Sequence, residues 1–337
     1  MAHRVTLADV SRAAGVGIAT VSRALATEPH RDVSPATRKR IREVADELGY
    51  RPSVAARALR SGGYHALSVV VPGNTWGWWE PVVRAAFQNA DAHGYQVLVH
   101  PVAGRPGGAA AVIESLGNVP TEGALLFGSA DDRAVHDAAQ HVRLPLVAID
   151  DVSEEVLVPT IGADSHGGAF DAVTHLVRSG RRRIAYVGSD NAAMFARDRL
   201  RGYRDALDAA GIVADEGVVV LCRDSEDESV ERYPEVDELL RAHPEIDAIF
   251  CEFDLIAAPV LRSLRAVGRA VPSDVALMGF DDERAAQLLD PTLSTIRQPY
   301  EDMGARAVDV LLRMVAGEPV PAERELLPTT LRLRRSS

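Results

Sequence analysis

The pattern of hydrophobic and polar positions changes its period near residue 65. Before that point, apolar residues recur at helical spacing in short runs. From Ala66 onward, short β-branched runs alternate with longer amphipathic runs, which is typical of parallel βαβ units. The pattern therefore predicts a small all-α segment followed by a large α/β segment.

The stretch VTLADVSRAAGVGIATVSRAL predicts two short helices that meet at a tight turn. We expect the first over residues 7–14, with Thr6 as its cap and Asp9 reaching back to that cap. Gly15 permits the sharp reversal, and the second helix follows over residues 18–25. The positions that face outward on the second helix are Ile18, Ala19, Ser22 and Arg23.

A third helix is expected to support this pair. Ser34 is suited to cap it, Pro35 fits its first turn and Gly49 stops it. Three small helices with a tight turn between the first two form the helix-turn-helix arrangement, whose second helix lies in the major groove of DNA. The predicted apolar positions are Val10, Ala14, Val16, Val21 and Leu25 under the pair, and Ile41, Val44, Ala45 and Leu48 on the third helix.

Charge separates the two segments. Residues 1–63 hold eleven Arg and Lys against six Asp and Glu, whereas the remainder holds 26 against 42. Only the first segment has the sign that attracts phosphates, which favours DNA binding. The alternative is a small protein-docking bundle whose arginines form a solvated face.

The segments TLADVSRAAGVGIATVSRAL and SPATRKRIREVADELGYRPSVAARALRSG closely resemble the DNA-binding headpiece of the lac repressor (LacI/GalR) family. One departure is Gly17, where the family usually has a Ser that caps the second helix and touches phosphate. Glycine is acceptable at a cap, so we expect weaker anchoring there, not loss. The resemblance implies base contacts from Ile18, Ala19 and Arg23, and phosphate contacts from Thr6, Thr20 and Ser22.

The segment YRPSVAARALRSGG is too short to hold as a helix alone in water. In the family it resembles, a hinge helix here folds on DNA, pairs with its twin in a dimer and wedges a leucine into the minor groove. Leu59 is the matching leucine, Ser53 replaces the usual Asn, and Ala56 is a further expected DNA contact. A plain flexible linker is the alternative.

The large segment predicts two similar lobes, each with about four strands, and resembles the periplasmic-binding-protein-like sensor domain of the same family. We expect an all-α helix-turn-helix headpiece over residues 1–50, a hinge over 51–63 and a two-lobed α/β effector-binding and dimerisation domain with parallel sheets over 64–337. Lobe one is assigned residues 64–162 and 294–322, and lobe two residues 163–293 and 323–337. Residues 160–163 and 293–296 are interpreted as crossings between lobes, and 300–315 as a helix returning to lobe one. The strands are predicted at 67–71, 96–99, 124–127, 146–149, 184–188, 218–222, 248–251 and 276–279.

In open parallel sheets, ligands bind beyond the carboxyl ends of the strands. The segments after these strands contain all three tryptophans, several aspartates and two arginines. Aromatic faces and charged hydrogen-bonding groups suit a polyhydroxylated ring, so we expect a sugar or sugar derivative. The resemblance implies effector contacts from Trp78, Trp79, Asp150, Arg199, Phe253 and Asp281.

Some of these positions have a second interpretation. Phe253 fits the core, and the tryptophan cluster fits a protein interface, where aromatics are also enriched. The loop WGWWEP departs from the family's Asn-Pro-aromatic-aromatic pattern, and Phe253 stands where several sugar-responsive members have Asn. These departures leave the identity of the effector open.

Several classes of site are not indicated. The sequence has no phosphate-cradling glycine loop, no Gly-x-Ser-x-Gly elbow, no HExxH and no metal-ligand spacing, so we expect neither catalytic residues nor a metal nor a cofactor. Cys222 and Cys251 fall in predicted buried strands and are expected to be unlinked thiols. The absence of a signal peptide and of any membrane-length apolar window predicts a cytoplasmic protein.

These observations predict a ligand-responsive transcriptional regulator, expected to be a repressor, that binds a near-palindromic operator as a homodimer. Its DNA affinity would depend on a small molecule in the cleft between the lobes. The end of the chain, LRLRRSS, has no leucine heptads, which favours a dimer over a tetramer. The alternative is a cytoplasmic enzyme for a sugar or nucleoside, with Asp150 and Asp281 as an acid/base pair.

Overall fold

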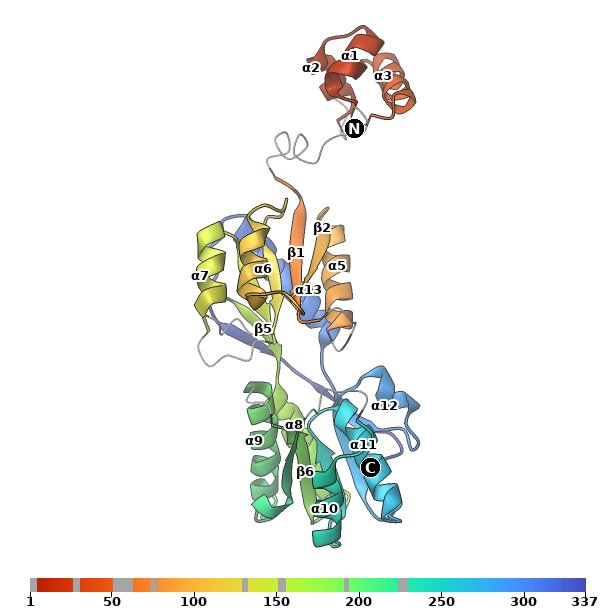
Figure 1. The fold of residues 1–337 in the computed structure, drawn as a ribbon, viewed down its shortest axis with the longest axis vertical. Coiled ribbons are helices and arrows are strands. Elements are labelled where there is room, and N and C mark those ends of the chain that lie inside the picture. Colours follow the sequence, from red (N-terminus) through yellow and green to blue (C-terminus); the bar gives the residue numbers. More distant parts are fainter. Residues whose placement is uncertain are drawn as a thin grey trace. The chain divides into compact units, whose positions relative to one another are not determined.

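The computed structural model describes residues 5–26, 31–50, 63–73, 77, 79–128, 133–150, 156–190, 194–223 and 230–337. The chain forms two compact units, Met1–Tyr64 and His65–Ser337. Their elements are labelled in Figure 1. The boundary between the units falls where the hydrophobic pattern changes its period.

The first unit is a bundle of α1 (Leu7–Ala14), α2 (Ile18–Ala24) and α3 (Pro35–Glu47). The predicted cap of α1 is confirmed, since the Asp9 amide donates to Thr6 Oγ1 at 3.4 Å and the Thr6 amide donates to Asp9 Oδ2 at 2.9 Å. This reciprocal pair satisfies two amides that have no partner inside the helix.

Packing and backbone geometry give the bundle its small core. Gly15 ends α1 with a φ of 64°, a left-handed conformation that glycine adopts without strain, and Ser34 caps α3 as predicted. Leu48, the C-cap of α3, is 38% exposed, so its predicted place in the apolar stripe is wrong. The buried apolar residues are Val10, Ala14, Val21, Ala24, Val33, Ile41 and Ala45.

The second unit contains two six-stranded sheets. The first has the order β2-β1-β3-β4-β5-β11 and is parallel throughout. Helices α5 and α13 cover one face and α6 and α7 the other (Figure 1). Its elements are β1 (Ala66–Val71), α5 (Glu80–Ala92), β2 (Gln96–Pro101), α6 (Gly108–Leu116), β3 (Ala124–Phe127), α7 (Arg133–Val142), β4 (Leu146–Ile149), β5 (Thr160–Ala163), α13 (Tyr300–Val315) and β11 (Arg324–Leu327).

The second sheet has the order β7-β6-β8-β9-β10-β12, with only β12 antiparallel to its neighbour. Helices α8 and α9 pack on one face and α10 and α11 on the other. Its elements are α8 (Ser165–Arg178), β6 (Ile184–Ser189), α9 (Met194–Ala209), η1 (Glu216–Val218), β7 (Val219–Cys222), α10 (Pro234–Ala242), β8 (Ala248–Cys251), α11 (Asp254–Ala266), β9 (Ala276–Asp281), α12 (Arg284–Leu288), β10 (Ser294–Arg297) and β12 (Thr330–Arg332).

The chain passes between the lobes at different points from those predicted. β10 pairs with β9 and so belongs to lobe two, whereas the prediction placed residues 294–322 in lobe one. β11 pairs with β5 and so belongs to lobe one, whereas the prediction placed residues 323–337 in lobe two. Neither segment was among the predicted strands, and a local sequence pattern does not say which sheet a strand's backbone bonds to.

Two smaller predictions are confirmed. Helix α13 packs against α5 and the first sheet, as expected of a helix that returns to lobe one. Cys222 and Cys251 are buried free thiols. Burial raises the pKa of the Cys222 thiol to about 12, so it stays protonated and unreactive.

Candidate functional site: an exposed helix and an inter-lobe pocket

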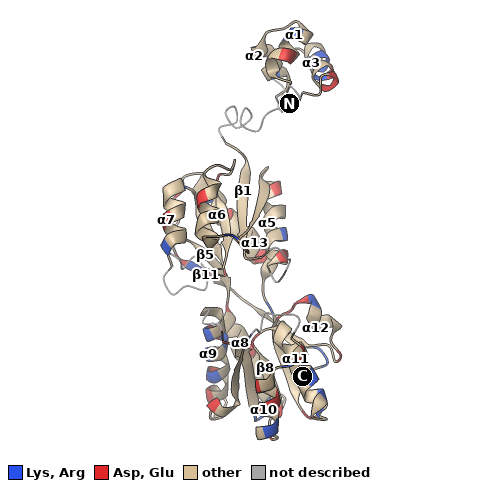
Figure 2. Ribbon diagram, in the orientation of Figure 1, with Lys and Arg blue, Asp and Glu red and all other residues tan. Residues whose placement is uncertain are grey.

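Helix α2 presents a surface that contributes nothing to the core of its unit. Val21 and Ala24 are fully buried beneath it, while Ile18 is 53% exposed. Ala19 and Arg23 are also exposed, and Thr20 and Ser22 are half-buried. Figure 2 marks basic residues on α3 of the same unit. The exposed outer positions of α2 are available to a partner.

Thr6 and Gly17, the N-caps of α1 and α2, differ in their hydrogen bonds. Thr6 Oγ1 donates to Asp9 Oδ2 at 2.7 Å, so its hydroxyl already serves the cap of α1. Gly17 is the N-cap of α2 and provides no side-chain hydrogen bond, which leaves the first amides of this helix to other acceptors. The hinge predictions at Ser53, Ala56 and Leu59 lie outside the described residues.

Arg199 is the centre of a buried cluster in lobe two. Its side chain projects from α9 and the residue is 2% exposed. Nη1 donates to the carbonyl of Glu252 at 2.7 Å and Nη2 donates to Asp281 Oδ1 at 3.1 Å. The guanidinium carbon lies 3.7 Å from the centroid of the Phe280 ring and 5.2 Å from that of Phe195. The charge is therefore held by one carboxylate, one carbonyl and two aromatic faces.

Asp281 completes this cluster at the end of β9. Its φ of 110° is unusual for a side-chain-bearing residue, and such strain concentrates at binding sites. Burial raises the pKa of Asp281, while Arg199 and a hydrogen bond from Gln298 Nε2 at 2.7 Å lower it, and the net direction is upward. The structure thus brings together Arg199 and Asp281, two residues that the sequence analysis assigned separately to the effector site.

Gln298 was missed by the sequence reasoning. It follows β10 and is 2% exposed, and its Oε1 atom has no hydrogen-bond partner within the described parts of the chain. The same holds for Arg199 Nε. A buried acceptor and a buried donor without partners are costly unless a ligand or water satisfies them. Its only sequence signal was its position one residue after a strand.

Glu252 provides the backbone carbonyl that accepts a hydrogen bond from Arg199. Its carboxylate accepts hydrogen bonds from the Ser189 amide at 2.9 Å, the Ser189 hydroxyl at 2.7 Å and the Tyr186 hydroxyl at 3.0 Å. A Cβ on Gly188 would lie 2.4 Å from Glu252 Oε2, so only glycine permits this arrangement. Burial raises the pKa of Glu252 despite these donors.

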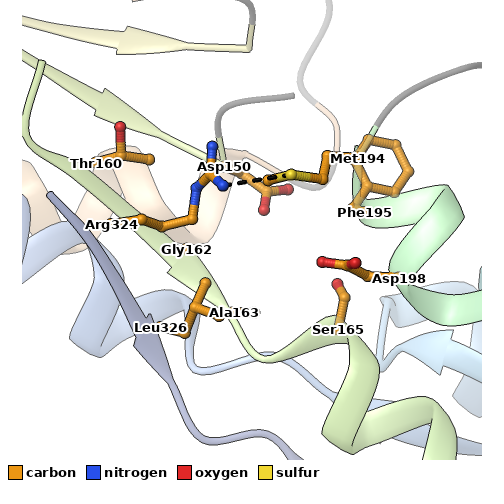
Figure 3. A pocket seen from close by; sticks show the side chains of 10 residues that line it. All are labelled: Asp150, Thr160, Gly162, Ala163, Ser165, Met194, Phe195, Asp198, Arg324 and Leu326. Atoms are coloured by element: carbon orange, nitrogen blue, oxygen red, sulfur yellow. Dashed lines mark hydrogen bonds between the residues drawn. The ribbon is translucent and has the colours of Figure 1, made fainter. Parts of the chain in front are cut away.

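A small open pocket, with a cavity volume of about 20 Å³, lies between the lobes beside this cluster. Lobe one contributes β4, β5 and β11, and lobe two contributes the starts of α8 and α9. Arg324 on β11 reaches across, with Nη1 3.3 Å from the sulfur of Met194 on α9 (Figure 3). The lining residues are Asp150, Thr160, Gly162, Ala163, Ser165, Met194, Phe195, Asp198, Arg324 and Leu326.

Asp150 connects the pocket to the buried cluster. It lies directly after β4 with a φ of 52° and lines the pocket from lobe one. Burial lowers the pKa of Arg199, but neighbouring carboxylates raise it and the net direction is upward. These carboxylates are Asp281, Glu252 and Asp150. Asp150 is therefore close enough to act electrostatically on a residue of the other lobe.

Two of the three predicted aromatic contacts, Trp79 and Phe253, do not line the pocket. Trp79 is 6% exposed and packs in the core of lobe one, with its ring centroid 6.4 Å from that of Phe127. Phe253 is half-buried and packs against the core of lobe two. Neither lines the pocket, and Trp78 lies outside the described residues. Phe195 is the aromatic side chain that the pocket does contain; the sequence reasoning did not select it because it lies within a helix.

Metal-binding clusters and membrane-spanning helices are both missing from the described residues. These residues contain no group of three or more His, Cys, Asp or Glu side chains placed to hold a metal ion. Among the described helices, none has both the length and the apolar character that crossing a bilayer requires.

Comparison with known proteins identifies the family of the chain. Residues 6–53 match the model of bacterial regulatory proteins of the lacI family, and residues 173–337 match a periplasmic binding protein-like domain. The chain is 34% identical over 346 residues to the HTH-type transcriptional regulator CelR of Thermobifida fusca, covering 99% of this chain and 98% of the relative. It is 31% identical over 335 residues to the transcriptional repressor CytR of Escherichia coli K12, covering 98% and 96%.

Solved structures agree along the full chain. A structure of the lac repressor dimer bound to operator and the anti-inducer ONPF has a TM-score of 0.84 and 25% identity, covering 99% of both chains. A CelR–cellobiose complex has a TM-score of 0.71 and 30% identity, covering 99% of this chain and all of that one. The predicted combination of a helix-turn-helix headpiece with a two-sheet sensor domain is thereby confirmed.

Proposed function

The chain belongs to the LacI family of bacterial regulatory proteins, and from this premise we propose that it is a transcriptional repressor whose DNA affinity is controlled by a small carbohydrate. The single observation that carries the proposal is the pocket between the lobes, which lies against a preorganised buried cluster. The exposed surface of α2 is the proposed DNA contact.

Several features support a DNA contact at α2. Its outer side chains lie outside the core. Its unit carries a net positive charge, while the rest of the chain is acidic. In a helix-turn-helix protein the second helix enters the major groove with its side chains on base edges. We propose that Ile18, Ala19 and Arg23 read bases. A homodimer would place two such helices on the half-sites of a near-palindromic operator.

The chemistry of the pocket supports a polyhydroxylated ligand. Carboxylates accept hydrogen bonds from hydroxyls, Arg324 donates them, and the Phe195 ring offers an apolar face. The unpartnered Oε1 of Gln298 also suits a hydroxyl donor. A related regulator has been solved with cellobiose, so cellobiose is the first ligand to test. We assign Asp150, Arg199 and Asp281 to the effector site.

Ligand control follows from the position of the pocket. A ligand that contacts both lobes changes their relative orientation, and this would alter how the two headpieces of a dimer meet DNA. Such coupling is typically about 1 to 3 kcal/mol, or about 5- to 150-fold in affinity.

An enzyme that uses Asp150 and Asp281 as an acid/base pair is disfavoured by the geometry. Asp281 Oδ1 already accepts hydrogen bonds from Arg199 and Gln298, so this oxygen is not available to a substrate proton. The relatives with 31% and 34% identity are named as transcriptional regulators.

The test is selection of duplexes from a random-sequence library by the full-length protein, followed by affinity measurements with cellobiose and a panel of other sugars. We expect a preferred sequence and a sugar that shifts its affinity. Asp150→Ala should abolish the shift and leave the ligand-free affinity unchanged. A protein with no sequence preference, in the presence or absence of any sugar, contradicts the proposal.

Arg23→Ala tests the base contact. If Arg23 makes a paired contact to guanine, its loss should cost about 1 to 3 kcal/mol and relax sequence choice. Arg313→Ala on α13 is the matched control, because its side chain is 46% exposed against 48% for Arg23. An unchanged binding profile for Arg23→Ala would remove this residue from the interface.

A further inference from the structure

The exposed guanidinium of Arg23 carries an ion pair. Its Nη1 atom lies 3.3 Å from Oδ2 of Asp32, and the two side chains are 48% and 60% exposed. Asp32 precedes α3, so the contact joins the proposed recognition helix to a separate element of the same unit. It is the one ion pair made by α2 in the described part of the chain.

Both partners lie next to residues that are buried in the core of the unit. Arg23 lies between Val21 and Ala24, which are fully buried. Asp32 is followed by Val33, which is 7% exposed and belongs to the core, and by Ser34, whose Oγ accepts from the Thr37 amide at 3.2 Å. Each side chain therefore extends into solvent from an anchored position, and the pair favours one placement of the guanidinium relative to α2.

The pair is poorly suited to stabilise the fold and well suited to orient a side chain. An ion pair this exposed contributes little to stability, because water competes for both partners. However, an unrestrained arginine must lose much rotamer freedom to form a two-bond contact with a base. Engagement of Nη1 by Asp32 leaves Nη2 and Nε, which can together donate to O6 and N7 of guanine.

The negative charge of Asp32 also favours specific over non-specific DNA binding. A carboxylate beside a DNA-facing helix repels phosphates, which weakens binding to any sequence. Other acidic groups of the unit serve different purposes: Asp9 caps α1, and Glu43 pairs with Lys39 on α3. Among the described carboxylates of the unit, Asp32 is the one shown in an ion pair with α2.

We propose that Asp32 is a positioning residue that orients Arg23 toward guanine and thereby sets the base preference of the protein. This inference rests on the proposed function, in which Arg23 reads a base. It assigns a specificity role to a residue outside the recognition helix, which acts on DNA through Arg23.

The experiment compares the full-length protein with Asp32→Asn, Arg23→Ala and the double variant in selection from a random-sequence duplex library. Asp32→Asn should lower the preference for guanine at the Arg23-dependent position by about two- to fivefold, the range that an exposed ion pair gives. The double variant should match Arg23→Ala, and Asp32→Glu should restore part of the preference. Affinity of Asp32→Asn for a mixed-sequence duplex should fall more steeply with salt.

Asp46→Asn is the matched control, since it removes an exposed carboxylate from α3 of the same unit without touching α2. It should alter the salt dependence and leave the base preference unchanged. The inference is overturned if both Asn variants have the same base preference as the parent, or if Asp32→Asn increases the preference for guanine. If Arg23→Ala itself leaves base preference unchanged, the role of Arg23 in the proposed function fails, and the role of Asp32 fails with it.

Discussion

Two arginine–aspartate pairs show how differently the two units of this protein use the same chemistry. In the small unit, Arg23 and Asp32 are 3.3 Å apart, with side chains 48% and 60% exposed. In the large unit, Arg199 and Asp281 are 3.1 Å apart, with side chains 3% and 10% exposed. The distances are nearly equal, so burial, not separation, determines what each pair does.

Water explains the difference. The exposed pair exchanges its contact for solvent at little cost, so it can orient a side chain without stabilising the fold. The buried pair has lost its solvent, so each charge depends on the other and on the hydrogen bonds around them. In the small unit, the side chains with the proposed function are exposed and lie outside the core. In the large unit, the paired residues of the candidate site are buried.

The largest effect expected from this comparison is that of Asp281→Ala. Removing one partner leaves the Arg199 charge buried without its carboxylate, which should lower the free energy of unfolding of the large unit by about 3 to 5 kcal/mol. All three tryptophans belong to this unit, so their fluorescence during urea unfolding reports it. Asp91→Ala, at an exposed position on α5, should change stability by less than about 0.5 kcal/mol. Equal losses from both variants would show that the buried pair has no special role.

A pH effect of intermediate size is expected from Glu252. Burial raises its pKa in the folded state, so the folded protein binds this proton more tightly than the unfolded chain. Its contribution to stability therefore falls as pH rises above about 4.5, the ordinary value, through the raised pKa. Glu252→Gln keeps hydrogen-bonding atoms without the charge. The difference in unfolding free energy should move in favour of the variant over this range, and a difference independent of pH argues against a raised pKa.

The smallest effect is expected at the cap of α2. Gly17 has a φ of −62°, and a Cβ at this position would meet no residue beyond its chain neighbours within 4 Å, so a serine fits there. Gly17→Ser should add a side-chain cap worth a few tenths of a kcal/mol and slow amide hydrogen exchange at the start of α2. Gly15→Ser is the contrasting variant, because φ there is 64° and a side chain is strained. Gly15→Ser should accelerate amide hydrogen exchange at the start of α2. Faster exchange in Gly17→Ser than in the parent would show that a side-chain cap does not stabilise this end of the helix.

Several elements could be predicted because their causes are local. The caps at Thr6 and Ser34 depend on residues three positions apart, and the strands Ala124–Phe127, Leu146–Ile149 and Ala248–Cys251 are short apolar runs that match the structure. In the candidate site, Asp150 and Asp281 could be selected because each lies at the carboxyl end of a strand.

The rest of the site depended on contacts that no local pattern contains. Gln298 joins Asp281 only because β10 pairs with β9, and Arg324 lines the pocket only because β11 pairs with β5. Trp79 was selected for its chemistry, yet the fold places it in the core. Composition identifies groups that can bind a ligand, but burial decides which of them face a pocket.

The amino-acid sequence by itself determined the helical headpiece and the two sets of strands, because these follow from turn residues, caps and periodicity within a few positions; the family was indicated separately, by the resemblance of its motifs. The tertiary structure alone decided which sheet β10 and β11 join, that Glu252 is buried with three donors, and that Arg23 meets Asp32. The physical reason is that strand pairing, desolvation and ion pairs between different elements exist only once the elements have packed.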